Sequence, residues 1–285
     1  ILTVTLNAAL DVTYDVDALV APGTNRVRSV VQRAGGKGVN VARTLHALAH
    51  DVVLTGFAGA EVKAELRTAG LHDEFVDTPG RRTITVVDGV DATVLCEPGP
   101  VISAEQWAFL IEQVHSLAVD ASAVVLSGSL PPGVPEDAYA QLGRAAGDHP
   151  VLLDTSGPAL LAGLAATPAV VKPNRDELAE LGASPESLLA GGAGAVVVSC
   201  GAEGLTAVTD AGSWRARPPE VVTGNPTGAG DAVVAALAAT VAEPWPERLR
   251  DAVALSAATV LAPVAGEFDR AAYERFRPAV TVEEI

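Results

Sequence analysis

The sequence predicts an α/β fold in which a mostly parallel β-sheet lies between two layers of helices. Two observations support this prediction. Short apolar segments alternate along the chain with longer helical patterns, and the apolar segments carry few polar residues, as in parallel strands that are buried on both faces. The expected strands of this sheet are residues 2–6, 52–57, 123–127, 151–154, 169–172 and 195–199.

The helical patterns fill the stretches between these strands. Apolar residues recur at helical spacing in residues 39–49, 62–69, 104–118, 135–146, 176–181, 246–261 and 270–276. After Asp231 a run of Ala, Val and Leu continues to Val241 without a charge, which is typical of a helix that is buried on every side. No linker-like segment divides the chain, so we expect a single domain over residues 1–285.

A second group of segments has a different pattern. Apolar and polar residues alternate in residues 12–17, 26–33, 83–87 and 92–96. Such alternation is typical of strands with one face open to solvent. We expect these four segments to form a small sheet that is separate from the main core.

Composition excludes several classes of function. The chain has 49% hydrophobic residues and a net charge of −16, which argues against a nucleic-acid-binding or anionic-membrane surface. Its apolar runs are short and interrupted, so no membrane span is expected. Two cysteines are too few for a disulfide scaffold and have no metal-binding spacing. With no leader pattern at the first residues, we expect a cytoplasmic protein.

The stretch Gly228-Ala229-Gly230-Asp231 is the strongest candidate site. It begins the apolar helix, and the first turn of a helix offers unpaired N–H groups and a partial positive charge to an anion. Glycines let a ligand approach the backbone closely. Asp231 would act there as a general base for a hydroxyl, while the N–H groups hold the developing charge. The alternative is that Asp231 only caps the helix.

A second glycine-rich entry to a helix lies at residues 34–40, where Gly35, Gly36 and Gly38 surround Lys37. It is similar to a phosphate loop but lacks the ending and spacing of a Walker A motif. Lys37 is one of three lysines in an acidic chain. It is either a ligand contact or an ordinary surface lysine.

Several predicted strands end in small polar or glycine-rich runs. These runs are residues 7–11, 127–131, 154–157, 172–177 and 199–204. Because the carboxyl ends of parallel strands meet at one edge of a sheet, we expect the runs to line a common crevice together with Asp231.

With these motifs the chain resembles the ribokinase-like (PfkB) sugar kinases along its whole length. Within that family it is most similar to the branch of bacterial 1-phosphofructokinases and tagatose-6-phosphate kinases. The motifs that carry the resemblance are TLNAALD (5–11), AGGKGVNVA (34–42), EPGP (97–100), SGSLPPG (127–133), KPNRDEL (172–178), SCGAEG (199–204) and NPTGAGD (225–231).

The resemblance implies a three-layer α/β/α domain with the small sheet as a lid, and ATP-dependent phosphoryl transfer to a sugar hydroxyl with Mg²⁺. It gives Asp231 the role of base and the backbone of Gly228, Ala229 and Gly230 that of the anion hole. The implied nucleotide and metal residues are Lys172, Asn174, Glu177, Ser199, Gly201 and Gly204, with Asn174 and Glu177 near Mg²⁺, in part through water. The implied sugar-side residues are Asp11, Gly35, Gly36, Lys37, Asn40, Arg82 and Ser129.

Arg82 occupies the position at which this branch places an arginine toward the substrate phosphate, but Arg81 precedes it and the register stays open. Isolated basic residues in an acidic protein favour a phosphorylated sugar over a neutral one. The expected reaction converts fructose 1-phosphate to fructose 1,6-bisphosphate, with tagatose 6-phosphate as the alternative acceptor.

Two further hypotheses concern other classes of protein. One is a sugar-phosphate or nucleotide binder without catalysis, although such a binder would have no need of Asp231. The other is a dinucleotide-dependent oxidoreductase, which would carry a G-x-G-x-x-G fingerprint after its first strand, and this chain does not. The expected partners are small molecules, with a homodimer through the lid as an open option.

Overall fold

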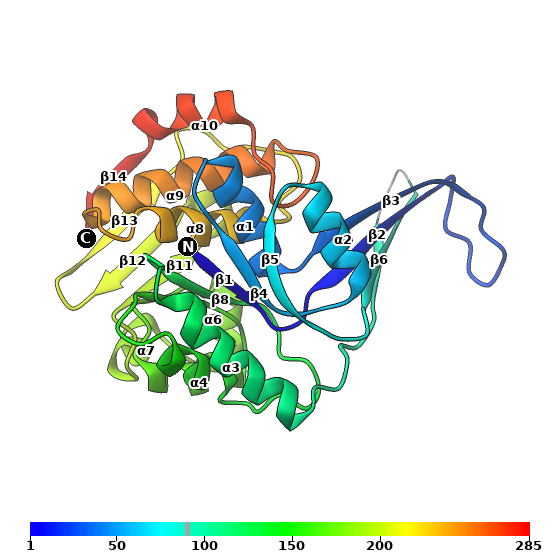
Figure 1. The fold of residues 1–285 in the computed structure, drawn as a ribbon. Helices are drawn as coiled ribbons and strands as arrows, with labels where there is room; N and C mark the ends of the chain where they lie inside the picture. The colour runs from blue at the N-terminus through cyan, green and yellow to red at the C-terminus, as the bar shows by residue number, and fades with distance from the viewer. Residues whose placement is uncertain (89–91) are drawn as a thin grey trace.

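The computed structural model describes residues 1–88 and 92–285, and in them a large central sheet organises the chain (Figure 1). From β5 to β11 neighbouring strands pair in parallel, whereas β11 to β14 pair antiparallel. In spatial order the strands are β14 (Thr281–Glu284), β13 (Gly212–Arg217), β12 (Leu205–Thr209), β11 (Ala195–Ser199), β10 (Val170–Val171), β9 (Val151–Asp154), β8 (Val124–Ser127), β1 (Leu2–Thr5), β4 (Val53–Ala58) and β5 (His72–Asp77).

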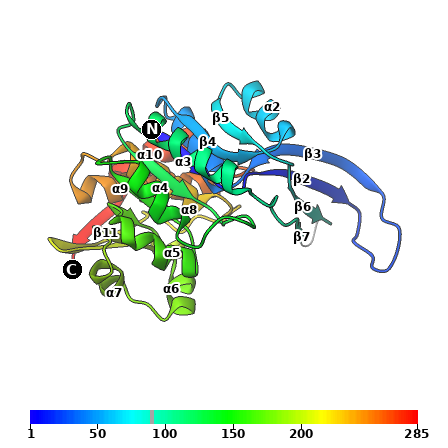
Figure 2. The ribbon, with the colours of Figure 1, turned by 60° about the horizontal axis from the view of Figure 1, so that its bottom comes forward.

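Helices cover both faces of this sheet, so the domain has three layers (Figures 1 and 2). One layer contains α1 (Lys37–Ala47), α2 (Ala60–Thr68), α8 (Ala229–Ala239), α9 (Trp245–Val260) and α10 (Arg270–Phe276). The other contains α3 (Ala104–Ala118), α4 (Ala138–Ala145), α5 (Pro158–Gly163), α6 (Arg175–Leu181) and α7 (Pro185–Ala190). Each layer packs its own apolar cluster against the sheet, which confirms the predicted α/β class.

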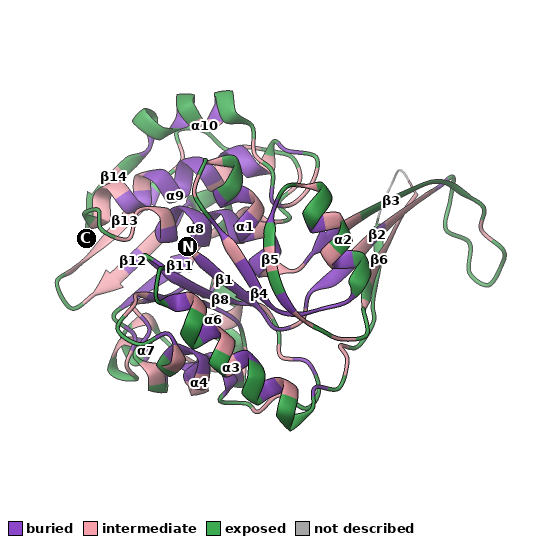
Figure 3. Ribbon diagram, in the orientation of Figure 1, coloured by how far each residue is buried: buried purple, intermediate pink, exposed green. Residues whose placement is uncertain are grey.

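The inner parallel strands were predictable because most of their residues are apolar. The strands β1, β8 and β9 are buried at every position, and Figure 3 shows this for β1. The sequence prediction missed β5, β12, β13 and β14, which lie at or near the two edges of the sheet. These strands are only partly buried, and β5 carries four charged or imidazole side chains in six residues. Strands of this kind lack the continuous apolar pattern on which the prediction rested.

Helix α8 lies at the centre of its layer. Residues 232–238 are each no more than 1% exposed, which agrees with the charge-free run in the sequence. Fully burying a valine or leucine contributes about 1.5–3 kcal/mol, so this helix is held firmly by its neighbours. It packs against α1 and α9, and its first turn reaches the carboxyl-end edge of the parallel strands. The helix that begins at the candidate site is therefore a rigid element of the core.

A smaller sheet projects from the body of the domain (Figures 1 and 2). Its strands, in spatial order, are β3 (Val27–Gly35), β2 (Ala9–Val16), β6 (Arg82–Val87) and β7 (Ala92–Cys96). The four half-polar segments of the sequence all contribute to it. Most of β3 is exposed, as Figure 3 shows. All of β7 is exposed as well, whereas Ala34 and Gly35 at the base of the sheet are buried.

Candidate active site

The start of α8, Gly228 to Asp231, has the features of an anion-binding site and is called the anion seat below. Gly228 is the N-cap residue and has a φ of 86°, a left-handed conformation that favours glycine. No side chain caps this helix. The N–H of Ala229 bonds to Pro226 and that of Ala232 to Gly228, whereas the N–H groups of Gly230 and Asp231 find no acceptor among the described residues. Two free N–H groups at the positive end of a buried helix are suited to hold an anion.

Asp231 does not cap its own helix. Its Oδ2 accepts a hydrogen bond of 2.8 Å from the Nδ2 amide of Asn40 on α1. Burial, followed by the negative charge of Asp154, raises the pKa of Asp231 to about 7, although Asn40, Lys37 and Lys172 act in the opposite direction. A carboxylate with a pKa near 7 is well matched to proton transfer at neutral pH. The geometry thus favours the base over the capping alternative.

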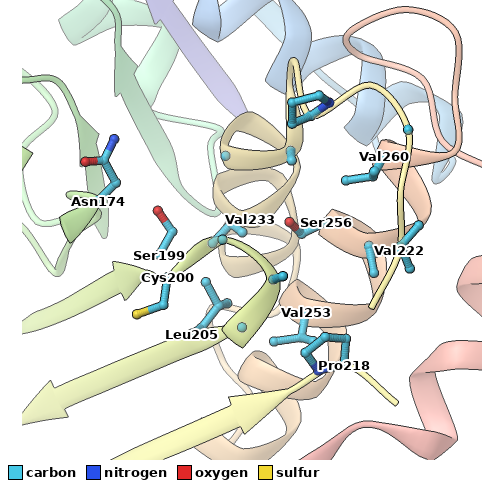
Figure 4. A pocket seen from close by; sticks show the side chains of 18 of the residues that line it. Asn174, Ser199, Cys200, Leu205, Pro218, Val222, Val233, Val253, Ser256 and Val260 are labelled. Atoms are coloured by element: carbon cyan, nitrogen blue, oxygen red, sulfur yellow. The ribbon is translucent and has the colours of Figure 1, made fainter. Parts of the chain in front are cut away.

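On one side of α8 lies a cavity of about 710 Å³. Its polar wall includes Asn174, Ser199, Gly201 and Gly204, together with Ala229 and Gly230 of the anion seat. Its other wall is apolar, and Figure 4 shows Val233, Val253 and Val260 around it. The sequence indicated the polar wall through the strand-end runs. It gave no sign of the apolar wall, because α9 and residues 218–226 resemble ordinary core and loop segments.

The N-x-x-E motif at the start of α6 forms a reciprocal cap. The Asn174 side chain accepts from the Glu177 N–H at 2.8 Å, and Glu177 Oε2 accepts from the Asn174 N–H at 2.8 Å. Glu177 Oε1 has no hydrogen-bond partner among the described residues. The motif therefore fixes a carboxylate with one free oxygen close to the wall of the large cavity.

A second cavity, of about 240 Å³, lies on the other side of Lys37. It is lined by Thr5, Asn7, Gly36, Lys37, Arg81, Gly128, Ser129, Thr155 and Ser156. Arg81 directly precedes β6, and the other residues come from the carboxyl ends of β1, β8 and β9 and from the glycine-rich entry to α1. The predicted common crevice is therefore divided in two: runs 7–11, 127–131 and 154–157 contribute to this cavity, and runs 172–177 and 199–204 to the large one. Lys37 is a cavity residue, whereas Asp231 lines neither cavity.

The two neighbouring arginines, Arg81 and Arg82, have different surroundings in the structure. Arg81 lines the second cavity, and its Nε donates to the backbone oxygen of Asn7 at 3.0 Å. Arg82 does not line this cavity; its Nη2 lies 3.3 Å from Glu61 Oε1 at an exposed position on β6. The geometry therefore favours Arg81 over the expected Arg82 as the arginine of this site.

Asp11 and Gly35 meet at the base of the small sheet, where β2 pairs with β3. A Cβ atom at Gly35 would lie only 1.9 Å from Asp11 Oδ2, so glycine is required for this approach. Burial raises the pKa of Asp11, whereas a hydrogen bond from Thr83 and the charges of Arg81 and Arg33 oppose the shift. Asp11 does not line the second cavity itself.

Lys37 and Lys172 converge on one carboxylate. The Nζ atoms of both lysines lie 3.2 Å from Asp154 Oδ1, and Asp154 is 1% exposed. Lys172 is 5% exposed, and its Nζ lies 3.5 Å from where a Cβ of Gly230 would be. The two ammonium groups therefore lie under the start of α8, between the two cavities.

Within the described residues, no group of three or more His, Cys, Asp or Glu side chains is arranged to hold a metal ion. None of the helices in residues 1–88 and 92–285 is long and apolar enough to cross a membrane.

Comparisons with known proteins identify the family of this fold and site. The family model for the pfkB family carbohydrate kinases matches residues 4–270. The 1-phosphofructokinase of Rhodobacter capsulatus is 40% identical over 283 residues, which cover 90% of this chain and 89% of that protein. The 1-phosphofructokinase of Xanthomonas campestris pv. campestris is 38% identical and covers 84% and 83%. The crystal structure of phosphofructokinase-2 from Escherichia coli in complex with fructose-6-phosphate superposes with a TM-score of 0.87 at 28% identity, over 98% of each chain.

Proposed function

Since the chain belongs to the pfkB family of carbohydrate kinases, we propose that it transfers the γ-phosphoryl group of ATP to a hydroxyl of fructose 1-phosphate and so forms fructose 1,6-bisphosphate. Two relatives at 38–40% identity over most of the chain bear the name 1-phosphofructokinase, which supports this acceptor. The transfer to a carbohydrate follows from the family, whereas the particular sugar phosphate is our proposal.

One observation carries the proposal: a small cavity with two cationic side chains lies next to a buried base. Lys37 and Arg81 both line the second cavity, and Ser129 and the amide of Asn7 add neutral polar groups. An arginine fork and an ammonium together suit a phosphate group. Lys37 is already paired with Asp154, but Arg81 donates to the backbone oxygens of Asn7 and Glu97 and forms no ion pair among the described residues, so a phosphate group would supply its counter-charge. The cavity therefore favours an acceptor that already carries a phosphate.

Asp231 would take the proton from the attacking hydroxyl. Its carboxylate is held by Asn40, and it follows Gly230, which lines the large cavity. The hydroxyl oxygen bonds to the γ-phosphorus as the bond from that phosphorus to the bridging oxygen of ATP breaks, which leaves ADP. The free N–H groups of Gly230 and Asp231 would then stabilise the charge on the transferred group.

We assign the large cavity to ATP. Its apolar wall suits a purine, whereas Ser199, Gly201 and the start of α8 offer polar contacts to the phosphates. Lys172 lies between this cavity and Asp154 and would contact the phosphates as a cation.

Glu177 and Asn174 fit a magnesium site at the nucleotide phosphates. Mg²⁺ prefers oxygen ligands, keeps several waters and is commonly held by one carboxylate and the substrate phosphates. Glu177 offers one free carboxylate oxygen, which would hold the ion directly or through water, and Asn174 orients it through the reciprocal cap. Bound Mg²⁺ would reduce the negative charge of the phosphates.

We further propose that the small sheet acts as a lid and pairs with a second copy of the chain. Asp11 at its base would contact the sugar, and closure would keep water from competing with the acceptor.

Large apolar side chains on the outer strands of the small sheet are exposed, among them Val31 at 56% and Val94 at 53%. A monomeric protein rarely leaves such a patch uncovered. Val94→Lys should shift the sedimentation coefficient to that of a monomer, and an unchanged coefficient would rule out this interface.

The test is release of ADP in a coupled assay with ATP, Mg²⁺ and one acceptor at a time. The acceptors are fructose 1-phosphate, fructose 6-phosphate, tagatose 6-phosphate, fructose and ribose. We expect the highest kcat/KM for fructose 1-phosphate. A preference for tagatose 6-phosphate would retain the mechanism and change the acceptor. Turnover of the unphosphorylated sugars alone would contradict the phosphate-binding role of Lys37 and Arg81. Binding without ADP release would indicate a non-catalytic binder.

A further inference from the structure

Asp154 is a buried carboxylate at the carboxyl end of β9, between the two proposed phosphate-binding places. It is 1% exposed, which is unusual for an aspartate unless it is paired. In the proposed reaction Asp154 neither takes the proton nor binds a substrate, although its charge helps to raise the pKa of Asp231. A negative charge beside two phosphates weakens their binding, so its presence calls for another role.

The role follows from its contacts. A single atom, Asp154 Oδ1, lies 3.2 Å from the Nζ atoms of both Lys37 and Lys172, so the two ammonium groups lie within about twice that distance of one another. Without the carboxylate, two like charges this close would repel each other, and their flexible side chains would move apart. Burial disfavours the charged form of Lys37, but attraction by Asp154, Asp231 and Glu177 more than offsets it and raises its pKa.

The other oxygen of Asp154 belongs to a row of buried polar atoms. Thr5, Ser127 and Asp154 are paired in register on the adjacent strands β1, β8 and β9. Thr5 Oγ1, Ser127 Oγ and Asp154 Oδ2 are all buried and have no hydrogen-bond partner among the described residues. The carboxylate is therefore fixed by the sheet and not by a partner on Oδ2. A rigid backbone anchor of this kind is what a positioning residue requires.

We propose that Asp154 is a positioning residue that holds Lys37 and Lys172 as a pair, and so aligns the acceptor with the γ-phosphoryl group of ATP. The proposal rests on the proposed function, because Lys37 lines the acceptor cavity and Lys172 lies on the nucleotide side. Alignment matters strongly for phosphoryl transfer, and a displacement of about 1 Å can cost about 10²-fold in rate.

The test is the kinetics of Asp154→Asn, which keeps the shape of the side chain and removes its charge. The freed lysines would still attract phosphates, so the KM for ATP and for the acceptor should stay the same or fall. The loss of alignment should lower kcat by about 10²-fold. This separation of kcat from KM indicates a role in the transition state and not in uniform binding. A kcat within threefold of the native value, or a rise in both KM values at unchanged kcat, would overturn the proposal.

Asp251→Asn is the matched control. Asp251 is also a buried carboxylate, 7% exposed, near the middle of α9, and it accepts hydrogen bonds from Tyr273 on α10 and from Arg277 just after α10. Its substitution should lower the melting temperature and leave kcat within twofold. A similar loss of kcat in both variants would show that Asp154 has only a structural role.

A double-mutant cycle locates the effect in the lysines. In a Lys37→Met background, Asp154→Asn should lower kcat by less than threefold further, because the pair is already broken. If the double variant instead lost kcat by the product of the factors measured for Asp154→Asn and Lys37→Met alone, the proposal would be overturned. Where Asp154→Asn fails to fold, Asp154→Ser, which places a second hydroxyl beside Ser127, serves in the same cycle. Failure of the proposed function is a separate outcome, because the native enzyme would then not turn over fructose 1-phosphate at all.

Discussion

The two cavities beside Asp231 differ in almost every physical respect. The larger one has an apolar wall from α9 and a backbone-rich polar wall, whereas the smaller one is lined by side chains that donate hydrogen bonds or carry positive charge. The larger cavity can select a ligand by shape and apolar area, and the smaller one by charge. Each half of the reaction should therefore be separable by substitution, and only the groups between the cavities should affect both.

The largest effect is expected for Asp231→Asn. General-base catalysis contributes about 10²–10⁴-fold, so kcat should fall by about 10³-fold while both KM values change little. Initial rates of ADP release measure this. Asp210→Asn, at an exposed position in the turn between β12 and β13, is the control and should retain full activity. If Asp231→Asn retained more than a tenth of the native kcat, the assignment of Asp231 as the base would be wrong.

Arg81→Ala should impair binding of the acceptor at the small cavity and leave ATP binding unchanged. A charge-assisted hydrogen bond contributes about 1.5–3 kcal/mol, so kcat/KM for fructose 1-phosphate should fall by about 10²-fold and the KM for ATP should stay the same. Arg82→Ala is the matched control, since its side chain is half exposed and pairs with Glu61. A larger loss for Arg82 than for Arg81 would reverse the assignment that the geometry favours.

Ala257→Phe should impair binding of ATP at the large cavity and leave acceptor binding unchanged. Ala257 lies in the apolar wall of the large cavity, and a phenyl ring there would occupy the space assigned to the purine. The KM for ATP should rise by about tenfold, an effect typical of overfilling an apolar pocket, while the KM for the acceptor stays constant. Leu261→Phe, just beyond the end of the same helix and 42% exposed, should change neither value.

The pH profile tests Asp231, the proposed base. Asp231 acts as a base only when it is deprotonated, and its pKa is raised to about 7 by burial and by Asp154. Accordingly kcat/KM should rise about tenfold between pH 6 and pH 8 and then level off. An acidic limb below pH 5 would show that the carboxylate has an ordinary pKa in the active enzyme.

The smallest effect concerns stability. A buried acid with a raised pKa is most favourable to folding at low pH, and this contribution is lost as the pH rises to the folded-state value of about 7. Asp231→Asn removes the buried charge, so it should raise the melting temperature by several degrees at pH 8 and by less at pH 5.5. Calorimetry at the two pH values measures the difference. A lower melting temperature at pH 8 would contradict a destabilising effect of the buried charge at position 231.

Much of this site could be predicted because its parts are local. Glycines before Asp231, the glycines around Lys37 and the Asn174–Glu177 motif each mark the start of a helix in the sequence itself, and all three lie where the structure begins α8, α1 and α6. The edge strands and the apolar wall of the large cavity were not predictable in the same way. Their residues follow patterns that are also common in ordinary loops and core helices.

The sequence by itself determined the α/β class, the buried helix α8 and the set of polar runs at the strand ends, since periodicity and turn chemistry act over a few residues. Only the tertiary structure decided that Arg81 and not Arg82 lines the cavity. Neighbouring side chains near a strand point to opposite faces, and the pairing of β6 with β2 determines which of the two faces the cavity. The tertiary structure alone also placed Asp154 between Lys37 and Lys172, residues that lie far apart in the chain. Contacts of this kind depend on the packing of whole elements, which no short stretch of sequence specifies.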